Sequence, residues 1–219
     1  MLLSFDVAAE AQDEHDDWHS HEHLPERLAI ASFLRGSRWR ALAGGPAYFV
    51  MYEVDELNVL SSPAYMQRLN HPSPWTAKMM PSYRGMRRGL REIVARAGHG
   101  LGGFGLLLRF GIEDHCQAAL CDWLAADVLP ALPAQAGLVS ALLLRSGMQA
   151  ESTVEQRIRG HDAGVDWTVL VTGFARSRVE ALGSRVPLLS ELEQRGASGV
   201  MSATYQLVHC LGQSDLSAG

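Results

Sequence analysis

The sequence predicts an α+β fold made of two successive β-α-β-β-α-β units, and three observations support this prediction. Strand-like apolar runs and helical patterns follow the same order in both halves of the 219-residue chain. The motif D-W-x5-L-P occurs twice, at Asp17–Pro25 and Asp122–Pro130, an offset of 122 − 17 = 105. The runs "LLSFDV" at Leu2–Val7 and "LLRFGI" at Leu107–Ile112 share that offset, since 107 − 2 = 105. Linked matches at one offset favour a duplication.

Local patterns predict each element of the first half in order. Asp13 is the expected N-cap of a helix that runs to about His23, because Pro25 disfavours helical geometry at the preceding residue and stops or kinks the helix. Ser62 and Pro63 open a second helical region, as N-cap and first helical residue, and a short further helix follows. Apolar, β-prone runs predict the four strands Leu2–Ala8, Phe33–Leu42, Ala47–Val54 and Met86–Ala95.

The second half repeats this order. Its predicted helices are Cys116–Leu129 and Arg178–Arg195, the latter interrupted near Pro187. Its predicted strands are Phe104–Ile112, Gly137–Arg145, Trp167–Phe174 and Val200–Leu211. The polar connection Gly147–Asp166 is either an exposed loop or a strand extension. We expect residues 1–98 to form one half, 103–212 the other and 213–219 a tail, with the glycine-rich "GHGLGGFG" as the hinge between the halves.

Each β-α-β-β-α-β unit predicts a ferredoxin-like half, a four-stranded antiparallel sheet with both helices on one face. The other face of each sheet must be covered. Packing the two sheets together therefore predicts an eight-stranded, pseudo-dimeric α+β barrel within one chain. The space between the sheets is then a natural cavity for a small organic molecule.

The composition is that of a globular protein and excludes several classes. Hydrophobic residues make up 47% of the chain and charged residues 20%, which is ordinary for a protein with a real core. A net charge of −5 argues against a nucleic-acid binder, which carries a basic excess. No apolar run approaches the ~20 residues of a membrane span, and the N-terminus lacks the basic start of a signal peptide. The three cysteines, without a C-x-x-C pair, fit reduced thiols in a cytoplasmic protein.

The first helix differs from its counterpart 105 residues later. Three histidines recur every four residues on one helical face, at positions that are apolar in the second copy: His15 by Leu120, His19 by Leu124 and His23 by Val128. Because the second copy is an ordinary amphipathic helix, we expect the histidines to point inward, toward the core or the cavity. A polar group buried without a partner costs about 1–3 kcal/mol, so three such groups need partners or a purpose.

These residue types point to proton chemistry, because histidine gives and takes protons near neutral pH. We expect His23, at the helix C-terminus, to be the acid/base group and His19 a second proton donor or acceptor. Arg38 or Arg40 is expected to hold an anionic or enolate oxygen. Candidate substrate-binding residues besides Arg40 are Trp18, Tyr52 and Trp75, although plain core packing is the commoner role for any one aromatic alone.

The third predicted strands of the two halves also differ in polarity, with the more polar pair of residues in the first half. Tyr52 and Glu53 are expected to stand opposite Thr172 and Gly173 of the second half. A solvated polar face remains the alternative interpretation of the histidine helix.

A metal site is the weaker alternative. His19 and His23 are spaced to grip one ion, and "HSHEH" matches H-x-x-E-H, the inverted zinc-peptidase motif. Histidine-rich sequence produces this match easily, and Pro25 follows at once. The sequence has no P-loop, no G-x-G-x-x-G after a strand and no G-x-S-x-G elbow. We therefore expect neither a metal nor a cofactor.

Two segments, "DWHSHEHLPERLAIASFLRGSRW" and "AYFVMYEVDELNVLSSPAYMQRLNHPSPWT", resemble the EthD-like branch of the dimeric α+β barrel superfamily. The resemblance covers about residues 1–96. The branch usually carries "PGF" before the second strand, whereas this chain has "IASF", which leaves the turn into that strand open. The resemblance implies a cofactor-free oxygenase, lyase, isomerase or dehydratase acting on small molecules; some branches bind haem. Members often associate, so a homodimer stays open.

The sequence therefore predicts a small-molecule enzyme in which His23 and His19 transfer protons on an apolar carbonyl or aromatic compound in the barrel cavity. Two alternatives stay open: a non-catalytic protein that binds such a ligand, and a stress or assembly protein whose barrel is filled. Turnover separates the first two, and a filled interior identifies the third.

Overall fold

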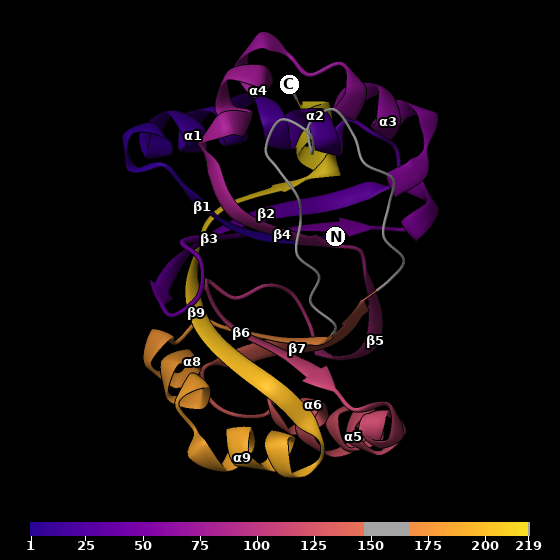
Figure 1. Ribbon diagram of the computed structural model, residues 1–219, viewed down its shortest axis with the longest axis vertical. Coiled ribbons are helices and arrows are strands. Elements are labelled where there is room, and N and C mark those ends of the chain that lie inside the picture. Colours follow the sequence, from indigo (N-terminus) through magenta and orange to yellow (C-terminus); the bar gives the residue numbers. More distant parts are fainter. Residues whose placement is uncertain (147–166, 219) are drawn as a thin grey trace.

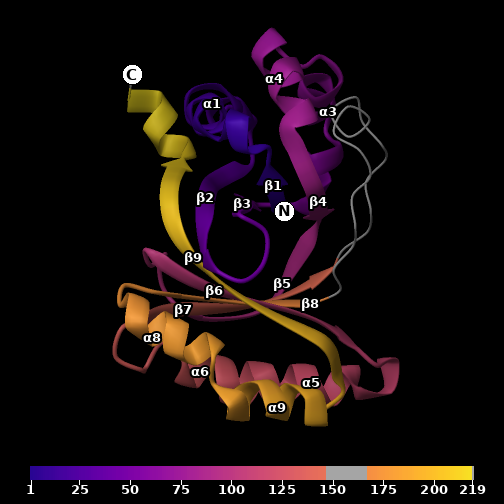
Figure 2. The ribbon, with the colours of Figure 1, turned by 60° about the vertical axis from the view of Figure 1, so that its left-hand side comes forward.

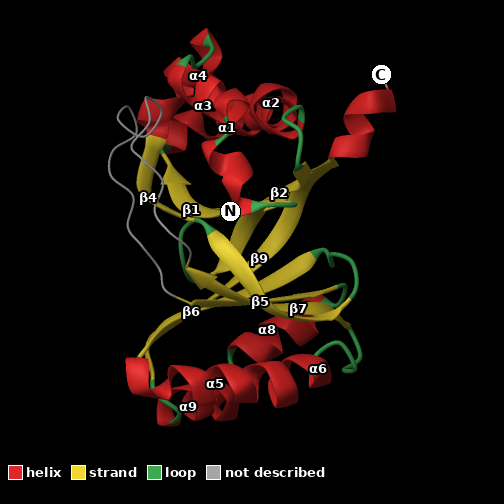
Figure 3. Cartoon of the chain, turned by 90° about the vertical axis from the view of Figure 1, so that its right-hand side faces the viewer, coloured by secondary structure: helices red, strands yellow, loops and turns green. Residues whose placement is uncertain are grey.

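The computed structural model describes residues 1–146 and 167–218, so the predicted connection Gly147–Asp166 lies outside the described residues. The described strands form one nine-stranded antiparallel sheet in the order β4-β1-β3-β2-β9-β6-β8-β7-β5. Helices α1–α4 cover one end of the molecule, helices α5, α6, α8 and α9 cover the other, and the strands lie between them (Figures 1 and 3). The predicted α+β class is confirmed.

The first half has strand order β4-β1-β3-β2, with its helices on one face. The strands are β1 (Leu2–Val7), β2 (Phe33–Ala43), β3 (Tyr48–Val54) and β4 (Tyr83–Gly89). The helices are α1 (Gln12–Trp18), α2 (Leu24–Leu28), α3 (Pro63–Asn70) and α4 (Pro74–Met79). Ser62 caps α3 as predicted, because its Oγ accepts a hydrogen bond from the Tyr65 N–H at 3.3 Å.

The second half has the corresponding order β9-β6-β8-β7. The strands are β6 (Phe104–Ile112), β7 (Leu138–Ser146), β8 (Trp167–Gly173) and β9 (Ala197–Gly212). The described helices are α5 (Gln117–Trp123), α6 (Leu129–Ala131), α8 (Arg176–Gly183) and α9 (Val186–Gln194). The predicted tail differs, because Gln213–Ala218 forms a 3₁₀ helix.

Strand β9 and the successive strands β4 and β5 join the two halves. Strand β9 pairs with β6 in its own half and with β2 in the other, and Figure 2 shows it running from one layer to the next. Strands β4 and β5 (Arg91–Gly98) are separated by Leu90 alone; β4 pairs with β1 and β5 with β7. The prediction of one uninterrupted strand over Met86–Ala95 was therefore wrong. The chain breaks at Leu90 because it changes sheets there.

The first helical region continues past Pro25, contrary to the predicted stop or kink. Between α1 and α2 the residues His19–His23 form a π-turn, and Leu24–Leu28 is helical again. Proline has no N–H and its ring opposes the carbonyl four residues earlier, so a wider turn before it avoids both problems. The same π-turn precedes Pro130, at Leu124–Val128, an offset of 124 − 19 = 105. The π-turn therefore follows from the shared L-P sequence and is not by itself a sign of function.

Asp13 is not the N-cap of the first helix. A 3₁₀ turn at Ala9–Ala11 runs directly into α1, and no side chain caps it. The register of the third strands also differs from the prediction. Leu2 pairs with Met51, and its counterpart Leu107 pairs with Leu170, so Met51 and Leu170 correspond. The next residue, Tyr52, therefore corresponds to Val171 rather than to Thr172.

The buried side chains form three clusters. One lies between helices and sheet in each half, and the third lies between the two sheets. Because side chains alternate along a strand, β2 sends Trp39 into the cluster between the sheets and its neighbours Arg38 and Arg40 toward helix α1. This alternation puts the predicted site residues on the helix side of the sheet. None of the described helices is both long and apolar enough to cross a membrane.

Candidate functional site

Three imidazoles are buried side by side in the core between helix α1 and the first sheet. His15, His19 and His23, here called the histidine ladder, are 0%, 2% and 9% exposed. Neighbouring ring centroids are 5.7 Å and 5.5 Å apart. The expected inward orientation is confirmed, and the side chains enter the helix–sheet core rather than the space between the sheets.

His15 is held by polar partners at both ring nitrogens. Its Nδ1 lies 3.2 Å from the Asp16 carboxylate and its Nε2 lies 3.2 Å from the Tyr83 hydroxyl. The ring also packs edge-on against Tyr48 with centroids 4.8 Å apart. Burial lowers the pKa of His15 and outweighs the carboxylate of Asp16, which acts to raise it. The neutral ring is therefore fixed in place by a carboxylate–imidazole–phenol chain.

His19 differs from His15 because its Nδ1 has no hydrogen-bond partner within residues 1–146 and 167–218. Burial is the main cause that holds its pKa well below the usual value of 6.5, and His15, Arg38 and His209 add repulsion. At neutral pH this imidazole is uncharged and carries a lone pair in a largely dry environment. Such a nitrogen can accept a proton from a ligand.

His209 reaches the same region from the other half of the chain. Arg38 on β2 pairs directly with His209 on β9, and the next pair along the strands is Trp39 with Leu207. Val208 lies between these two pairs without a partner of its own, so it forms a β-bulge in β9. The His209 Nε2 is buried and has no hydrogen-bond partner in the described part of the chain. Three elements of the molecule, the π-turn, β2 and β9, therefore place polar groups around His19.

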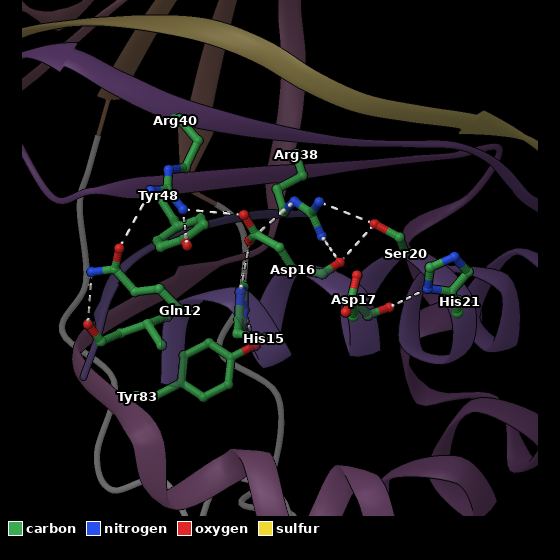
Figure 4. Close-up of polar contacts among 11 residues, drawn as sticks. Gln12, His15, Asp16, Asp17, Ser20, His21, Arg38, Arg40, Tyr48 and Tyr83 are labelled. Carbon is green, nitrogen blue, oxygen red and sulfur yellow. Dashed lines mark hydrogen bonds and ion pairs between the residues drawn. The ribbon is translucent and has the colours of Figure 1, made fainter. Parts of the chain in front are cut away.

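Arg38 and Arg40 bind helix α1 to strand β2 (Figure 4). Arg38 donates to the Asp16 carbonyl at 2.9 Å and to Ser20 Oγ at 3.0 Å, while its buried Nε finds no hydrogen-bond acceptor among the described residues. Arg40 donates to the Asp16 carboxylate at 3.1 Å and to the Tyr48 hydroxyl. Both guanidinium groups thus position the helix, and the buried Nε of Arg38 lies 3.7 Å from the Asp16 carboxylate, beyond hydrogen-bond distance.

Trp18 forms the wall of the ladder beside His23. It is fully buried, and its ring centroid lies 4.4 Å from that of His23. Its indole N–H donates to the Glu22 carboxylate at 3.1 Å and to Thr76 Oγ1 at 3.3 Å. These bonds attach the π-turn to helix α4 and fix the indole plane.

Two other predicted site residues make their contacts elsewhere. The Tyr52 ring packs against Phe33 with centroids 5.9 Å apart. The indole N–H of Trp75 donates to Glu14 at 3.1 Å, on the half-buried side of helix α1. The structure therefore brings together the ladder, Trp18, Arg38 and Arg40, and leaves Tyr52 and Trp75 outside this network.

The ladder does not gather its nitrogens around one point. Among the described residues, one set of three possible metal-binding side chains has donor atoms within 4.8 Å of one another, and it consists of Glu113, His115 and Cys116. That set is in the other half and largely exposed. The Glu22 of the H-x-x-E-H match is bonded to Trp18 and Thr76.

The space between the sheets contains two adjoining pockets of about 270 and 110 Å³. Both are lined by Met51 and Leu142, so the predicted cavity exists. Neither lining includes a member of the ladder. The prediction that the histidines face this cavity was therefore wrong, because helix α1 packs on the other face of the first sheet, toward which Arg38 and Arg40 point. Tyr52, a predicted substrate-binding residue, does line the larger pocket.

Sequence reasoning missed Asp16, Tyr83 and His209. Asp16 lies beside His15, and a carboxylate adjacent to a buried imidazole is a signal that could have been used. Tyr83 opens the last strand of the first half and meets His15 across 68 residues. His209 falls within the predicted strand Val200–Leu211, and only the pairing of β2 with β9 brings it to Arg38.

No family model matches the chain, and the comparison with curated proteins gave no significant match. Solved structures do match. An anthrone oxidase-like protein superposes with a TM-score of 0.70 at 12% identity, over 97% of this chain and 91% of that protein. A proposed monooxygenase from Fusobacterium nucleatum gives 0.62 at 8% identity, over 96% and 92% of the two chains. A proposed monooxygenase from Lactobacillus acidophilus gives 0.57 at 8% identity, over 97% and 94%. These likenesses show a shared α+β fold.

Proposed function

We propose that this protein is a small-molecule enzyme that moves a proton on an apolar carbonyl or aromatic compound, with His19 as the base. One observation carries the proposal: the buried imidazole of His19, whose Nδ1 lacks a hydrogen-bond partner within residues 1–146 and 167–218. Its counterpart 105 residues later, Leu124, is equally buried and apolar. A buried polar atom without a partner is costly, so its presence in one half alone favours a role with a ligand.

The proposed step begins at a carbon next to a carbonyl group. His19 Nδ1 takes the proton, the electron pair of the broken C–H bond forms an enolate, and the enolate oxygen accepts a hydrogen bond from the Arg38 Nε–H. The proton then returns from His19 to another carbon in an isomerase, or the enolate expels a leaving group in a lyase. A cofactor-free oxygenase would add dioxygen as a second substrate.

The lowered pKa of His19 supports this role. Burial keeps the imidazole neutral at pH 7, so it is ready to accept a proton. Once protonated, the ring is a stronger acid than free histidine and returns the proton readily. The sequence favoured His23 as the main group, and we now propose His23 as the second proton carrier, next to His19 and packed against Trp18.

The other predicted residues take different proposed roles. Arg40 is a positioning residue, because it acts on the site through Asp16. Trp18 remains a wall for an aromatic or carbonyl ligand. Tyr52 and Trp75 have no part in the proposed step. The names of the fold neighbours, an oxidase-like protein and two proposed monooxygenases, agree with an enzyme acting on small molecules.

Deuterium exchange tests the proton step. Anthrone, a ketone with exchangeable carbon-bound protons, is incubated with the protein in D₂O and followed by proton NMR. We expect the protein to accelerate exchange and His19→Gln to slow it by a factor of about 100 or more. His21→Gln is the matched control, because His21 is two residues away but exposed. Exchange no faster than in buffer, or an active His19→Gln variant, would refute the proposal.

We also propose that the chain is a tandem repeat of the EthD-like type, with halves at residues 1–98 and 103–212. The support is the offset of 105 between the bounds of α1 and α5 and between the two π-turns. A second support is that the two half-sheets have the same strand order. The two halves then form the barrel that two chains would otherwise build.

A further inference from the structure

The larger pocket between the sheets, about 270 Å³ in volume, is lined by apolar residues together with arginines and acidic residues. Its volume corresponds to about nine water molecules at ~30 Å³ each, which is room for a small organic molecule. Leu2, Met51, Leu142 and Leu144 form apolar walls, and Arg91 and Arg96 belong to the lining as well. The pocket thus joins apolar surface to positive charge.

Three aromatic rings pack together at the opposite end of the barrel. Trp39, Phe49 and Tyr205 are each fully buried and pack in contact, with centroids 5.4 Å and 5.3 Å apart. Strand pairing identifies their counterparts at the pocket end. The counterpart of Trp39 is Leu144, because 144 − 39 = 105. Trp39 pairs with Phe49 and Leu144 pairs with Thr168, so the counterpart of Phe49 is Thr168.

The counterpart of Tyr205 is Arg91. Tyr205 pairs with Ala41 and Arg91 pairs with Ser146, and 146 − 41 = 105. Leucine, threonine and arginine therefore stand at one end where tryptophan, phenylalanine and tyrosine stand at the other. The aromatic rings fill their end, and the smaller side chains leave the pocket.

Arg91 is held in a defined place on the pocket wall. It is only 8% exposed. A Cβ built on Gly89 would lie 2.6 Å from Arg91 Nη2 and 2.7 Å from its Cζ, so the guanidinium rests directly on the bare backbone of Gly89. Only glycine at this position allows that arrangement. The strand break at Leu90 turns the chain so that Arg91 enters the space between the sheets.

The acidic residues of the lining are mostly engaged. Glu53 forms an ion pair with Arg35 at 2.7 Å, and Glu92 forms one with Arg145 at 2.6 Å. Asp55 is exposed. Arg96, which lines both pockets, forms no ion pair with any residue in 1–146 or 167–218. The lining therefore combines two arginines, Arg91 and Arg96, with apolar side chains.

We propose that this pocket is a second binding site, separate from the histidine ladder, and that it binds a small amphipathic anion. The carboxylate of the ligand would meet Arg91, and its apolar part would lie against Met51, Leu142 and Leu144. A guanidinium is well suited to a carboxylate, because its N–H groups form two parallel hydrogen bonds.

Titration calorimetry with two probes of equal chain length, octanoate and octan-1-ol, tests the site. We expect octanoate to bind about tenfold more tightly than octan-1-ol, because it adds a charge-assisted hydrogen bond. Arg91→Gln should remove that advantage and leave octan-1-ol binding unchanged. Gly89→Ala keeps the charge but displaces the guanidinium, and should weaken octanoate similarly. Leu142→Trp, which fills the pocket, should abolish binding of both probes.

Gly103→Ala is the matched control, because a Cβ there meets no atom within 4 Å; it should bind both probes like the native chain. Circular dichroism checks that each variant folds. The proposal is overturned if neither probe binds, if both bind equally, or if Arg91→Gln and Gly89→Ala retain the preference for octanoate. His19→Gln should leave octanoate binding unchanged, so this site and the proposed proton step succeed or fail independently.

Discussion

His19 and Leu124 show how one substitution changes the chemistry of a site without changing its frame. The two residues are 2% and 1% exposed, and each begins a π-turn of the same length. His15 and Leu120 are both fully buried. Because the two helices and their π-turns have corresponding bounds, the difference at these positions lies in the side chains. One half buries leucines at no electrostatic cost, and the other buries neutral imidazoles.

The buried His19 makes stability depend on pH. Burial holds its folded pKa well below 6.5, so between that folded pKa and pH 6.5 the unfolded chain binds a proton that the folded chain does not. The contribution to stability is complete above pH 6.5 and is lost as the pH falls through the folded pKa. The free energy of unfolding should fall by up to about 1.4 kcal/mol per pH unit for this group.

Urea unfolding at pH 7.5, 6.5 and 5.5 measures this dependence. His19→Leu, which imports the residue of the second half, should reduce the slope by one proton. His21→Leu is the control and should leave the slope unchanged, because His21 is exposed. Equal slopes for the native chain and His19→Leu would contradict the assignment of a lowered pKa to His19.

At the scale of elements, helix α1 is fixed to strand β2 by one carboxylate. Asp16 faces Arg40 at 3.1 Å and Arg38 Nε at 3.7 Å, and its oxygen also lies 3.2 Å from His15. The guanidinium of Arg38 is nearly buried. The contacts set the height of the helix above the sheet, and with it the position of the ladder.

Asp16→Asn should therefore destabilise the fold by about 2 kcal/mol. The change leaves the buried Arg38 without a nearby carboxylate, although partial exposure of Asp16 reduces the penalty. Asp17→Asn is the matched control, since the neighbouring carboxylate is exposed and should matter by less than about 0.5 kcal/mol. Urea unfolding measures both variants. Equal effects of the two substitutions would rule out this role for Asp16.

At the scale of the whole molecule, the halves share strands rather than only touching. Strand β9 of the second half pairs with β2 of the first half as well as with β6 of its own. In turn, β4 pairs with β1 in the first half, and β5, which follows it in the chain, pairs with β7 in the second. Ser4 and Arg109, which are 105 residues apart, bond to each other between the sheets at 2.8 Å. Separation of the halves would expose the cluster between the sheets and two unpaired strand edges.

The chain should consequently unfold in one cooperative transition. Leu28→Ala in the first half and Leu120→Ala in the second remove fully buried side chains, and each should lower the free energy of unfolding by about 3 kcal/mol. Differential scanning calorimetry should show a single peak that moves in both variants. Two peaks, of which one moves in each variant, would mean that the halves are independent folding units.

Much of the fold could be predicted from particular segments. The run Phe104–Ile112 and the Ser62 cap appear in the structure as predicted, because both depend on local preferences of the backbone. The helix through Pro25 could not be predicted from proline alone, since a π-turn relieves the clash that otherwise ends a helix. The break at Leu90 depends on which partner strand lies beside each part of the chain.

The candidate site divides in the same way. Periodicity alone put the three histidines on one buried face, because helical spacing is a local property of the sequence. It could not give the side of the sheet on which they lie relative to the cavity, nor the approach of His209 or Tyr83. Those contacts join residues far apart in the chain.

The sequence by itself determined the two β-α-β-β-α-β units and the exchange of leucine for histidine in one of them, since both are written in local spacing. Tertiary structure alone decided that the ladder faces the helices, that Arg91 enters the space between the sheets, and that aromatic rings fill only the other end of the barrel. Strand alternation and partner choice set those directions, and both are fixed only when the sheets pair and pack.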